Sequence, residues 1–262
     1  MVRSLYTAAT GMKAQQLSID TVSNNIANVN TTGYKKQRAE FADLMYQVMA
    51  YAGTSTSATT ISPTGIEVGL GVRTTAIQKK FTQGNYKETG NTLDVAIAGD
   101  GFFQIQLPDG TTAYTRAGAF KFDENGVIVT ADGFPLLPQV TVPADTTQLT
   151  IGVDGTISVM QAGQTQSNQI GQLELANFIN PAGLHSLGDN NYINTTASGD
   201  PVTSQPGLNG FGQTRQMFLE ISNVQLVDEM TDLITGQRAY EAGSKAITTS
   251  DEMLSTVVGL KR

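Results

Sequence analysis

The chain has 262 residues and a formal net charge of −7, and it contains no cysteine. Its length allows one or two hydrophobic cores. Phosphate binding needs clustered Lys and Arg, and no basic run occurs, so the composition argues against nucleic acid or an anionic membrane as the main partner. Disulfides and thiolate metal sites are excluded outright.

The N-terminus does not resemble a signal peptide. Its first stretch, MVRSLYTAATGMKAQQLS, is interrupted by Thr7, Lys13 and Gln15 and lacks a continuous apolar segment. No later stretch approaches the ~20 apolar residues of a membrane span. We therefore expect no direct membrane insertion, and either a cytoplasmic location or export without a cleaved signal.

The first predicted element is a helix with one narrow apolar stripe. An apolar residue recurs every seven positions, and a second row, with Gln15 as its polar exception, follows three positions later. The first row is Leu5, Met12, Ile19 and Ile26, and the second includes Ala8, Val22 and Val29. The run NNIANVNTTGYKK from Asn24 then predicts a helix end and a chain reversal, since Asn and Gly33 favour turn conformations.

The middle of the chain changes character. Residues 45–63 are rich in Ser, Thr, Ala and Gly, show no period, and are expected to form an extended loop or linker. From Ile66 onward, short apolar runs alternate with turn dipeptides, which predicts antiparallel strands. These dipeptides are Asp109-Gly110, Asn125-Gly126, Asp132-Gly133 and Asp154-Gly155. A second loop is expected over residues 190–212.

The C-terminal end predicts a longer helix. Ser222 with Gln225 fits a capping box, Ile221 with Leu226 fits a hydrophobic staple, and the helix is expected to stop near Gly259. An apolar row is spaced by seven: Leu219, Leu226, Leu233, Tyr240, Ile247 and Leu254.

A second row on this helix has small side chains apart from Glu229. It comprises Ser222, Glu229, Gly236, Gly243 and Ser250. Because a glycine inside a helix costs roughly 1 kcal/mol relative to alanine, two glycines on one row indicate that another backbone approaches there.

These patterns predict an α+β fold in which long N- and C-terminal helices form a coiled-coil module and the middle of the chain forms an antiparallel β-rich domain. The expected parts are residues 1–35 and 215–262 for the helices, 36–90 and 190–214 for connecting regions, and 91–189 for an outer β domain. The alternative is an ordinary pair of core helices in a globular domain. Against it, the stripes are narrow and the last helix exceeds the usual ~10–14 residues.

No arrangement of residues indicates catalysis, a cofactor or a metal. The single histidine, His185, lies in an expected loop, and no nucleophile elbow, dinucleotide fingerprint or phosphate loop occurs. Asp94 and Asp100 flank an apolar strand without the spacing of a known site. The segment DENG from Asp123 lacks the further ligands of a calcium loop and predicts a hairpin turn.

Three segments resemble the bacterial flagellar axial proteins, which form the rod, the hook and hook-associated structures. They are SNNIANVNTTGYKK, LDVAIAGDGFFQIQLPDGTTAYTRAGAF and SNVQLVDEMTDLITGQRAYEAGSKAITTSDEML, and with their surroundings they cover essentially the whole chain. The N-terminal motif residues carried over are Asn24, Asn25, Ile26, Ala27, Asn28, Thr32, Gly33, Tyr34 and Lys35.

The resemblance implies a non-enzymatic subunit of a helical tube around an export channel. Such proteins leave the cell through the flagellar type III apparatus without a signal peptide. Implied partners are copies of the chain, proximal rod and hook proteins, the P- and L-ring proteins, the rod cap and the export apparatus. The implied location is the basal body, from periplasm to outer membrane.

Length and the segment after Met45 resemble the distal rod members of the family most, where this segment distinguishes a straight rod from a curved hook. Hook and proximal rod subunits are the near alternatives. The residues marking this rigidifying segment are Met45, Tyr51, Thr60 and Pro63. A secreted β-domain binding module with helical oligomerisation ends is a more distant alternative. It requires an exposed aromatic platform, whereas Phe102, Phe103, Tyr114 and Phe120 fit a core.

Overall fold

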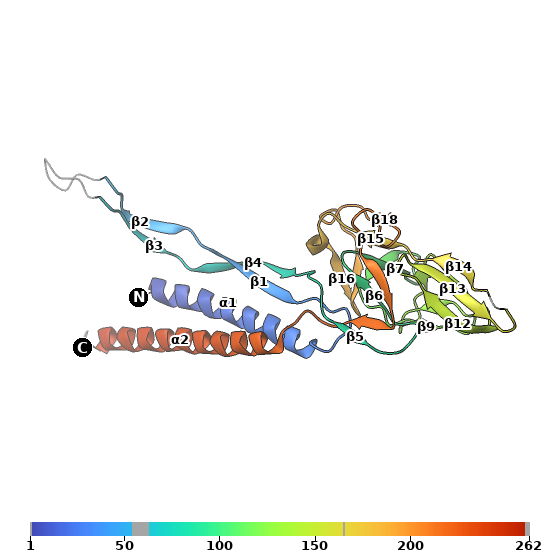
Figure 1. Cartoon of the computed structure of the whole chain (residues 1–262). Helices are drawn as coiled ribbons and strands as arrows, with labels where there is room; N and C mark the ends of the chain where they lie inside the picture. The colour runs from blue at the N-terminus through green and yellow to red at the C-terminus, as the bar shows by residue number, and fades with distance from the viewer. Residues whose placement is uncertain (1, 54–62, 165, 260–262) are drawn as a thin grey trace. The chain divides into compact units, whose positions relative to one another are not determined.

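The computed structural model describes residues 2–53, 63–164 and 166–259, and the chain forms two compact units (Figure 1). The first unit comprises residues 1–26, 37–78 and 225–262, and the second comprises residues 27–36 and 79–224. Long helices lie at the two ends of the chain and the strands lie between them in sequence. The predicted α+β class is confirmed.

The first unit consists of two antiparallel helices and two narrow β ribbons. Strand β1 pairs with β4, and β2 pairs with β3. The Oγ1 of Thr10 on α1 accepts a hydrogen bond from Val72 N at 3.4 Å. Figure 1 shows α1 between α2 and the β1–β4 ribbon. The elements are α1 (Val2–Ala27), β1 (Gln37–Asp43), β2 (Tyr46–Ala50), β3 (Ile66–Gly69), β4 (Val72–Lys79) and α2 (Leu226–Gly259).

The expected linker over residues 45–63 begins with a strand, which corrects the sequence prediction. Tyr46 pairs with Gly69 and Val48 pairs with Glu67 across the β2–β3 ribbon. Both faces of this ribbon carry exposed side chains, so the alternation of apolar and polar residues that identifies a half-buried strand is missing. Residues 54–62, which include Thr60, lie outside the described residues.

The C-terminal helix begins later than its seven-residue row predicts. Leu219 lies in strand β20 (Phe218–Glu220) and pairs with Lys87, so it does not belong to α2. Ser222 accepts a hydrogen bond from Val224 N at 3.2 Å, and α2 starts at Leu226. Because Leu219 precedes Leu226 by one heptad, the spacing extends into the strand although the backbone there pairs with β5.

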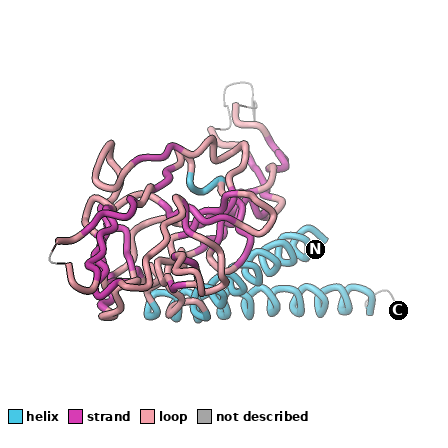
Figure 2. Tube along the Cα trace, turned by 90° about the vertical axis from the view of Figure 1, so that its right-hand side faces the viewer, coloured by secondary structure: helices cyan, strands magenta, loops and turns pink. Residues whose placement is uncertain are grey.

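The second unit is built from short strands (Figure 2), and those of its largest sheet pair antiparallel. Its largest sheet has the order β16-β17-β8-β7-β15-β18, with β11 also pairing with β7, and β12-β13-β14 form a smaller sheet. Strand β19 pairs with β6, β20 with β5, and β10 with β9. The strands are β5 (Tyr86–Glu88), β6 (Val95–Ala98), β7 (Phe102–Gln106), β8 (Thr112–Thr115), β9 (Lys121–Phe122), β10 (Ile128–Val129), β11 (Leu136–Leu137), β12 (Thr146–Ile151), β13 (Thr156–Gln161), β14 (Asn168–Gln172), β15 (Leu175–Asn177), β16 (His185–Gly188), β17 (Asn191–Ile193), β18 (Val202–Ser204) and β19 (Gln213–Gln216), with one short helix at Pro181–Gly183.

The four predicted turn dipeptides are confirmed as turns. Their glycines have φ between +73° and +84°, a region that glycine adopts without steric cost. At the DENG segment, Gly126 N donates to Asp123 O at 2.9 Å, which closes the β9–β10 hairpin. A turn therefore accounts for this acidic segment without a metal.

The aromatic residues of the central segment lie in the core. Phe102, Phe103, Tyr114 and Phe120 are each no more than 3% exposed, so they form no surface platform. The Phe103 and Phe120 rings meet edge to face with centroids 5.1 Å apart. The more distant alternative, a binding module with an exposed aromatic platform, loses the feature it requires.

The expected second loop over residues 190–212 is also corrected. It contains β17, which lies inside the large sheet between β16 and β8, and the edge strand β18. Tyr192 on β17 pairs with Tyr114 and is fully buried. Strands of only three residues among Asn, Thr and Gly are too short to show a period in the sequence.

Candidate assembly site

The N-terminal motif supplies a side chain that ties three elements of the first unit together. Asn25, at 1% exposure, donates from Nδ2 to Gln37 O at 2.8 Å and accepts at Oδ1 from Gln37 N at 2.9 Å. The same Nδ2 donates to Glu229 Oε2 at 3.0 Å. Asn25 thereby connects the end of α1, the start of β1 and the first turn of α2. Because the N–H and the C=O of Gln37 both bond to the Asn25 side chain, the backbone at the start of β1 is held in one conformation.

The second half of the motif turns the chain within the second unit. Gly33 has a φ of +70°, and its N donates to Glu220 O at 2.9 Å. A methyl group on its Cα would lie 2.7 Å from Ala117 N, so no larger residue fits. Thr32 O accepts from Asn190 Nδ2 at 2.9 Å. The bend that the sequence predicts at Gly33 is confirmed.

Lys35 ends the turn in a buried ion pair. Its Nζ lies 2.6 Å from Glu220 Oε1 and 2.9 Å from Thr82 O, with both charged side chains no more than 1% exposed. Burial, together with the Arg116 guanidinium, lowers the pKa of Lys35 from its ordinary 10.5, and the Glu220 carboxylate opposes this shift. Buried charges persist only when paired and hydrogen-bonded, and Lys35 meets both conditions.

Glu220 joins Lys35 to a second cation. Arg116 Nε lies 3.5 Å from Glu220 Oε2, and Gly84 N donates to Glu220 Oε1 at 2.8 Å. The Arg116 guanidinium also donates to Gly101 O and Gly99 O, each at 2.8 Å. Lys35, Glu220 and Arg116 thus form a buried group that links strand β20 to the loops around residues 82–84 and 99–101.

Lys36 extends this network of hydrogen bonds through its backbone. Its N donates to Asn223 Oδ1 at 2.7 Å, and its O accepts from Lys80 N at 2.8 Å. Asn223 Nδ2 donates back to Lys80 O at 2.8 Å and to Thr82 O at 3.1 Å. The polar motif therefore ends α1 and also forms hydrogen bonds to several distant segments of the chain.

The two terminal helices contact each other through the row of small residues. A methyl group on Gly236 would lie 3.2 Å from Ile19 Cγ1, and one on Gly243 would lie 2.7 Å from Met12 Cγ. Ser250 Oγ lies 3.5 Å from Ser4 Oγ. Gly236, Glu229 and Ser250 are the buried residues of α2. The atoms nearest to both glycines belong to side chains of α1, so the two helices approach along this row through side chains and not through the backbone that the sequence predicts.

The predicted apolar rows are only partly covered within one chain. Val22 is buried, whereas Leu226 and Tyr240 are each 42% exposed. The other members of the two rows that lie on helices are of intermediate exposure: Leu5, Met12, Ile19, Ile26, Leu233, Ile247 and Leu254. Of the remaining motif residues, Asn24 and Ala27 are exposed, Asn28 is partly buried and Tyr34 is buried.

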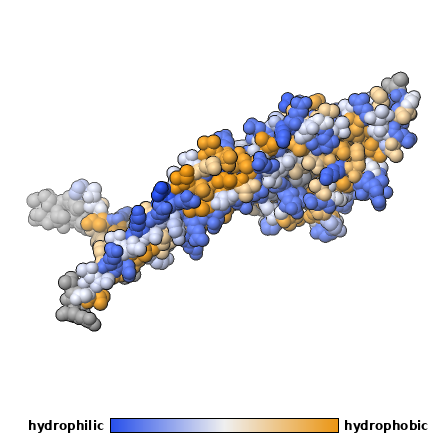
Figure 3. Space-filling model, turned by 90° about the horizontal axis from the view of Figure 1, so that it is seen from below, coloured by the Kyte–Doolittle hydropathy of each residue, from blue (hydrophilic) through white to orange (hydrophobic). Residues whose placement is uncertain are grey.

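Further apolar side chains on α2 and on the β2–β3 ribbon are exposed. Figure 3 views the side on which α2 lies in Figure 1 and shows apolar surface gathered there. On the helix, Val227 is 76% exposed, Met230 52% and Ile234 57%. On or beside the ribbon, Met45 is 83% exposed and Tyr51 71%. Pro63 is exposed at a bend. Exposed apolar clusters of this kind are typical of surfaces that bind another protein.

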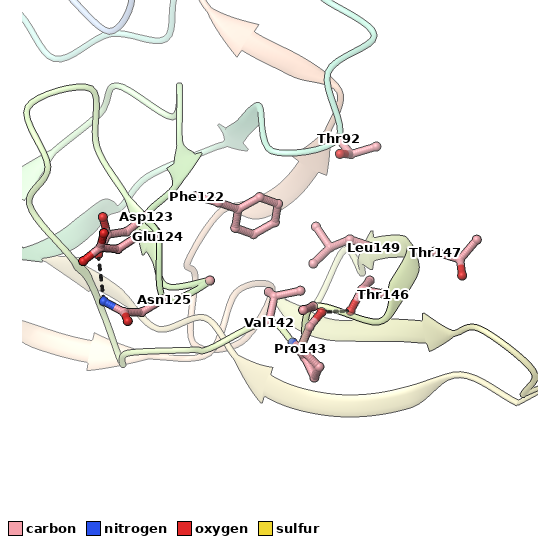
Figure 4. Close-up of a pocket in the computed structure, with 12 residues that line it drawn as sticks. Thr92, Phe122, Asp123, Glu124, Asn125, Val142, Pro143, Thr146, Thr147 and Leu149 are labelled. Atoms are coloured by element: carbon pink, nitrogen blue, oxygen red, sulfur yellow. Dashed lines mark hydrogen bonds between the residues drawn. The ribbon is translucent and has the colours of Figure 1, made fainter.

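A cleft in the second unit offers no catalytic arrangement. It measures about 470 Å³ and lies between the β9–β10 turn and the segment leading into β12 (Figure 4). Phe122 and Leu149 line its apolar part, while Asp123 Oδ2 accepts from Asn125 Nδ2 at 3.4 Å. Over residues 2–53, 63–164 and 166–259, no group of three acidic or histidine side chains is placed to hold a metal. Among the same residues, no helix is long and apolar enough to span a membrane.

Comparison with known proteins identifies the class. Residues 5–35 match the family described as "Flagella basal body rod protein", residues 96–159 match "Flagellar hook protein FlgE/F/G D1 domain", and residues 215–260 match "Flagellar basal body rod FlgEFG protein C-terminal". These segments overlap the three motifs of the axial proteins, in the same order. The flagellar resemblance is confirmed.

Relatives match over the full chain. The flagellar basal-body rod protein FlgG of Buchnera aphidicola subsp. Schizaphis graminum is 50% identical over 254 residues, covering 97% of this chain and 98% of the relative. FlgG of Agrobacterium fabrum is 50% identical over 257 residues, covering 98% of each chain. FlgG of Borreliella burgdorferi is 48% identical over 264 residues and the whole of both chains. The chain belongs to the family of flagellar basal-body rod proteins.

As a member of this family, the chain is a structural component of the flagellar basal body. The family implies assembly with further copies and with other basal-body and hook proteins. Sequence patterns missed Glu220, Arg116 and Asn223. Glu229 was visible only as the large residue in a row of small ones.

Proposed function

We propose that this chain is the subunit of the distal rod, polymerising into a rigid hollow helical shaft that transmits torque from the motor to the hook and encloses the export channel. The proposal rests on the different side chains that α2 carries on its different faces. Its small row packs against α1, while its bulky apolar residues range from partly buried, as at Leu233, to 76% exposed at Val227. Because the glycine row makes the contact with α1 of the same chain, the larger side chains of α2 are available to contact other copies.

In this polymer, residues 1–35 and 215–262 form a coiled-coil-like inner module with neighbouring copies, and residues 36–90 and 190–214 connect it to the outer part. Residues 91–189 form the outer part, and β17 and β18 of the 190–214 region add strands to its sheet. The exposed face of α2 meets a different surface on the next copy. Heterologous contacts that do not close into a ring generate open helical filaments. The half-exposed Leu226 and Tyr240 supply part of this contact.

The β2–β3 ribbon acts as the rigidifying segment. A ribbon of two strands is marginally stable alone, and here Met45 and Tyr51 are largely exposed. Contacts with neighbouring copies would order it and would have to break whenever the tube bends. Met45, Tyr51 and Pro63 mark the described part of this segment.

The proposed partners are copies of the chain, proximal rod and hook subunits, the surrounding P- and L-ring proteins, and the rod cap and export apparatus during assembly. The proposed location extends from the periplasm to the outer membrane. The role is mechanical and not enzymatic. The acidic composition and the lack of a basic run support neither nucleic-acid binding nor membrane insertion.

Electron microscopy of the purified full chain at high concentration tests the function. Straight hollow rods are expected. Curved tubes would instead favour a hook subunit, and a chain that stays monomeric at every concentration would contradict both. Full-length identity to basal-body rod proteins supports the rod over the hook.

A further inference from the structure

We propose that the buried hydrogen bond between Asn25 and Glu229 fixes the axial register of α1 against α2, and that α2 fits α1 in a second register, displaced by seven residues, when this bond is moved. Glu229 is fully buried and Asn25 is 1% exposed. Their side chains form a polar contact at one end of the interface between α1 and α2. Along the rest of that interface, similar contacts recur every seven residues.

The repeat leaves the register weakly specified by packing alone. Along the antiparallel pair, Asn25 contacts Glu229, Ile19 lies over Gly236 and Met12 lies over Gly243. Seven residues make about two helical turns, so a displacement of ~10.5 Å along the axis returns nearly the same face. In that second register Ile19 would lie over Gly243, and Met12 would lie over Ser250, another small residue.

Glu229 opposes displacement in both directions. Moving α2 one way would place its carboxylate beside Ile19, and burying an unpaired charge there is costly. Moving it the other way would leave Asn25 over Gly236 and break the bond to Glu229. A single buried polar residue is a known way for coiled helices to specify register. Asn25 is itself fixed by two hydrogen bonds to the Gln37 backbone, so the register of α2 is tied to the start of β1.

The chain provides a reporter at the far end of the same interface. Ser4 and Ser250 have Oγ atoms 3.5 Å apart, and a displacement by seven residues would bring Val257 to the place of Ser250. The protein has no cysteine, so any disulfide formed must come from an engineered pair. Ser4→Cys with Ser250→Cys reports the observed register, and Ser4→Cys with Val257→Cys reports the displaced one. Mobility on a non-reducing gel separates links within one chain from links between chains.

The decisive experiment moves the carboxylate by one heptad in the full chain, with Glu229→Gly and Gly236→Glu combined. We expect the ratio of the 4–250 link to the 4–257 link to fall at least about tenfold. The charge keeps Asn25 as its partner, but Asn223 holds the chain just before α2. Helix content by circular dichroism is therefore expected to fall by only about two turns at the start of α2. Retention of the 4–250 link as the dominant product would overturn the proposal. So would a parent chain that does not form it.

Single variants provide matched controls. Glu229→Gln keeps an acceptor for Asn25 and is expected to keep the parent ratio. Glu229→Leu has similar bulk but no acceptor, and we expect both links to form. A Glu229→Leu chain with the parent ratio would show that packing alone fixes the register.

Discussion

Lys35 Nζ and Glu220 Oε1 lie 2.6 Å apart with both side chains buried, although the two residues are 185 positions apart in the chain. The pair joins the end of the N-terminal motif to strand β20, immediately before the segment that leads to α2. The polar motif therefore has an internal structural role in addition to ending a helix.

Removing one partner of this pair is expected to be strongly destabilising. Lys35→Met would leave the buried Glu220 with the Gly84 N–H and with Arg116, whose Nε lies 3.5 Å away. We expect a loss of about 3–5 kcal/mol in the free energy of unfolding. Urea denaturation of the full chain measures this loss. Lys80→Met, at an exposed position, is the matched control and should change stability by less than about 0.5 kcal/mol. Equal stability of the two variants would contradict the buried pair.

The buried Tyr192 hydroxyl predicts that the stability of the fold decreases at alkaline pH. Its hydroxyl is buried without a hydrogen-bond partner among the described residues, and burial raises its pKa well above the ordinary 10.0. Its contribution to stability is therefore complete below pH 10.0 and is lost as the pH rises above it, because only the unfolded chain ionises there. Tyr192→Phe should be neutral or stabilising by up to about 1 kcal/mol at pH 7 and should flatten the alkaline decline.

Thermal melts of the Tyr192→Phe variant across neutral and alkaline pH check both expectations. Tyr6→Phe, at a position 61% exposed, is the control and should leave the profile unchanged. A loss of more than about 1 kcal/mol in Tyr192→Phe at neutral pH would mean that the hydroxyl is satisfied after all.

Charges on the apolar row of α2 should block assembly and spare the fold of the second unit. Leu233→Asp or Ile247→Asp would place an unpaired carboxylate in a packed contact of the polymer, at a cost of several kcal/mol. Sedimentation and electron microscopy measure assembly, and the cooperative melt of the strands reports folding. Thr235→Asp adds the same charge on another, exposed face and should still polymerise. Normal polymers from Leu233→Asp would exclude this row as an interface.

The glycines of the two helices should respond differently to substitution. Gly11 has open space around its Cα, so Gly11→Ala should stabilise the helices by about 0.5–1 kcal/mol. Gly243 lies against Met12, and Gly243→Leu should force the helices apart at a cost of about 1–3 kcal/mol. Circular dichroism melts compare the two. Stabilisation by Gly243→Leu would contradict the close approach.

Deleting residues 48–62 tests stiffness. The variant loses part of β2 and should still polymerise, but into a curved or more flexible tube, because the contacts that resist sliding between subunits are gone. Micrographs give the curvature directly. Rods as straight as the parent would refute a rigidifying role, and complete loss of assembly would show that the segment does more than stiffen. Replacing the same residues by a Gly/Ser chain of equal length controls for connectivity.

Local signals predicted much of this fold. The helices follow from seven-residue spacing, the hairpins from Asp-Gly and Asn-Gly pairs, and the close helix contact from Gly236 and Gly243. Leu219 shows where local signals fail, because its spacing fits the helix while its backbone pairs with β5. The ion group of Lys35, Glu220 and Arg116 could not be predicted, since its members come from distant segments and only the folded sheets bring them together.

Because α2 carries glycine on one face and leucine on another, substitutions on the two faces should cause two different kinds of mutant defect. Substitutions at Gly236 or Gly243 should damage the subunit itself, whereas substitutions at Leu233 or Ile247 should yield sound subunits that fail to join. A scan along this helix would then show two defects, each repeating every seven residues and offset from one another. Sequence can therefore drift on the outer row, adapting the shaft to its neighbours, without disturbing how each subunit folds.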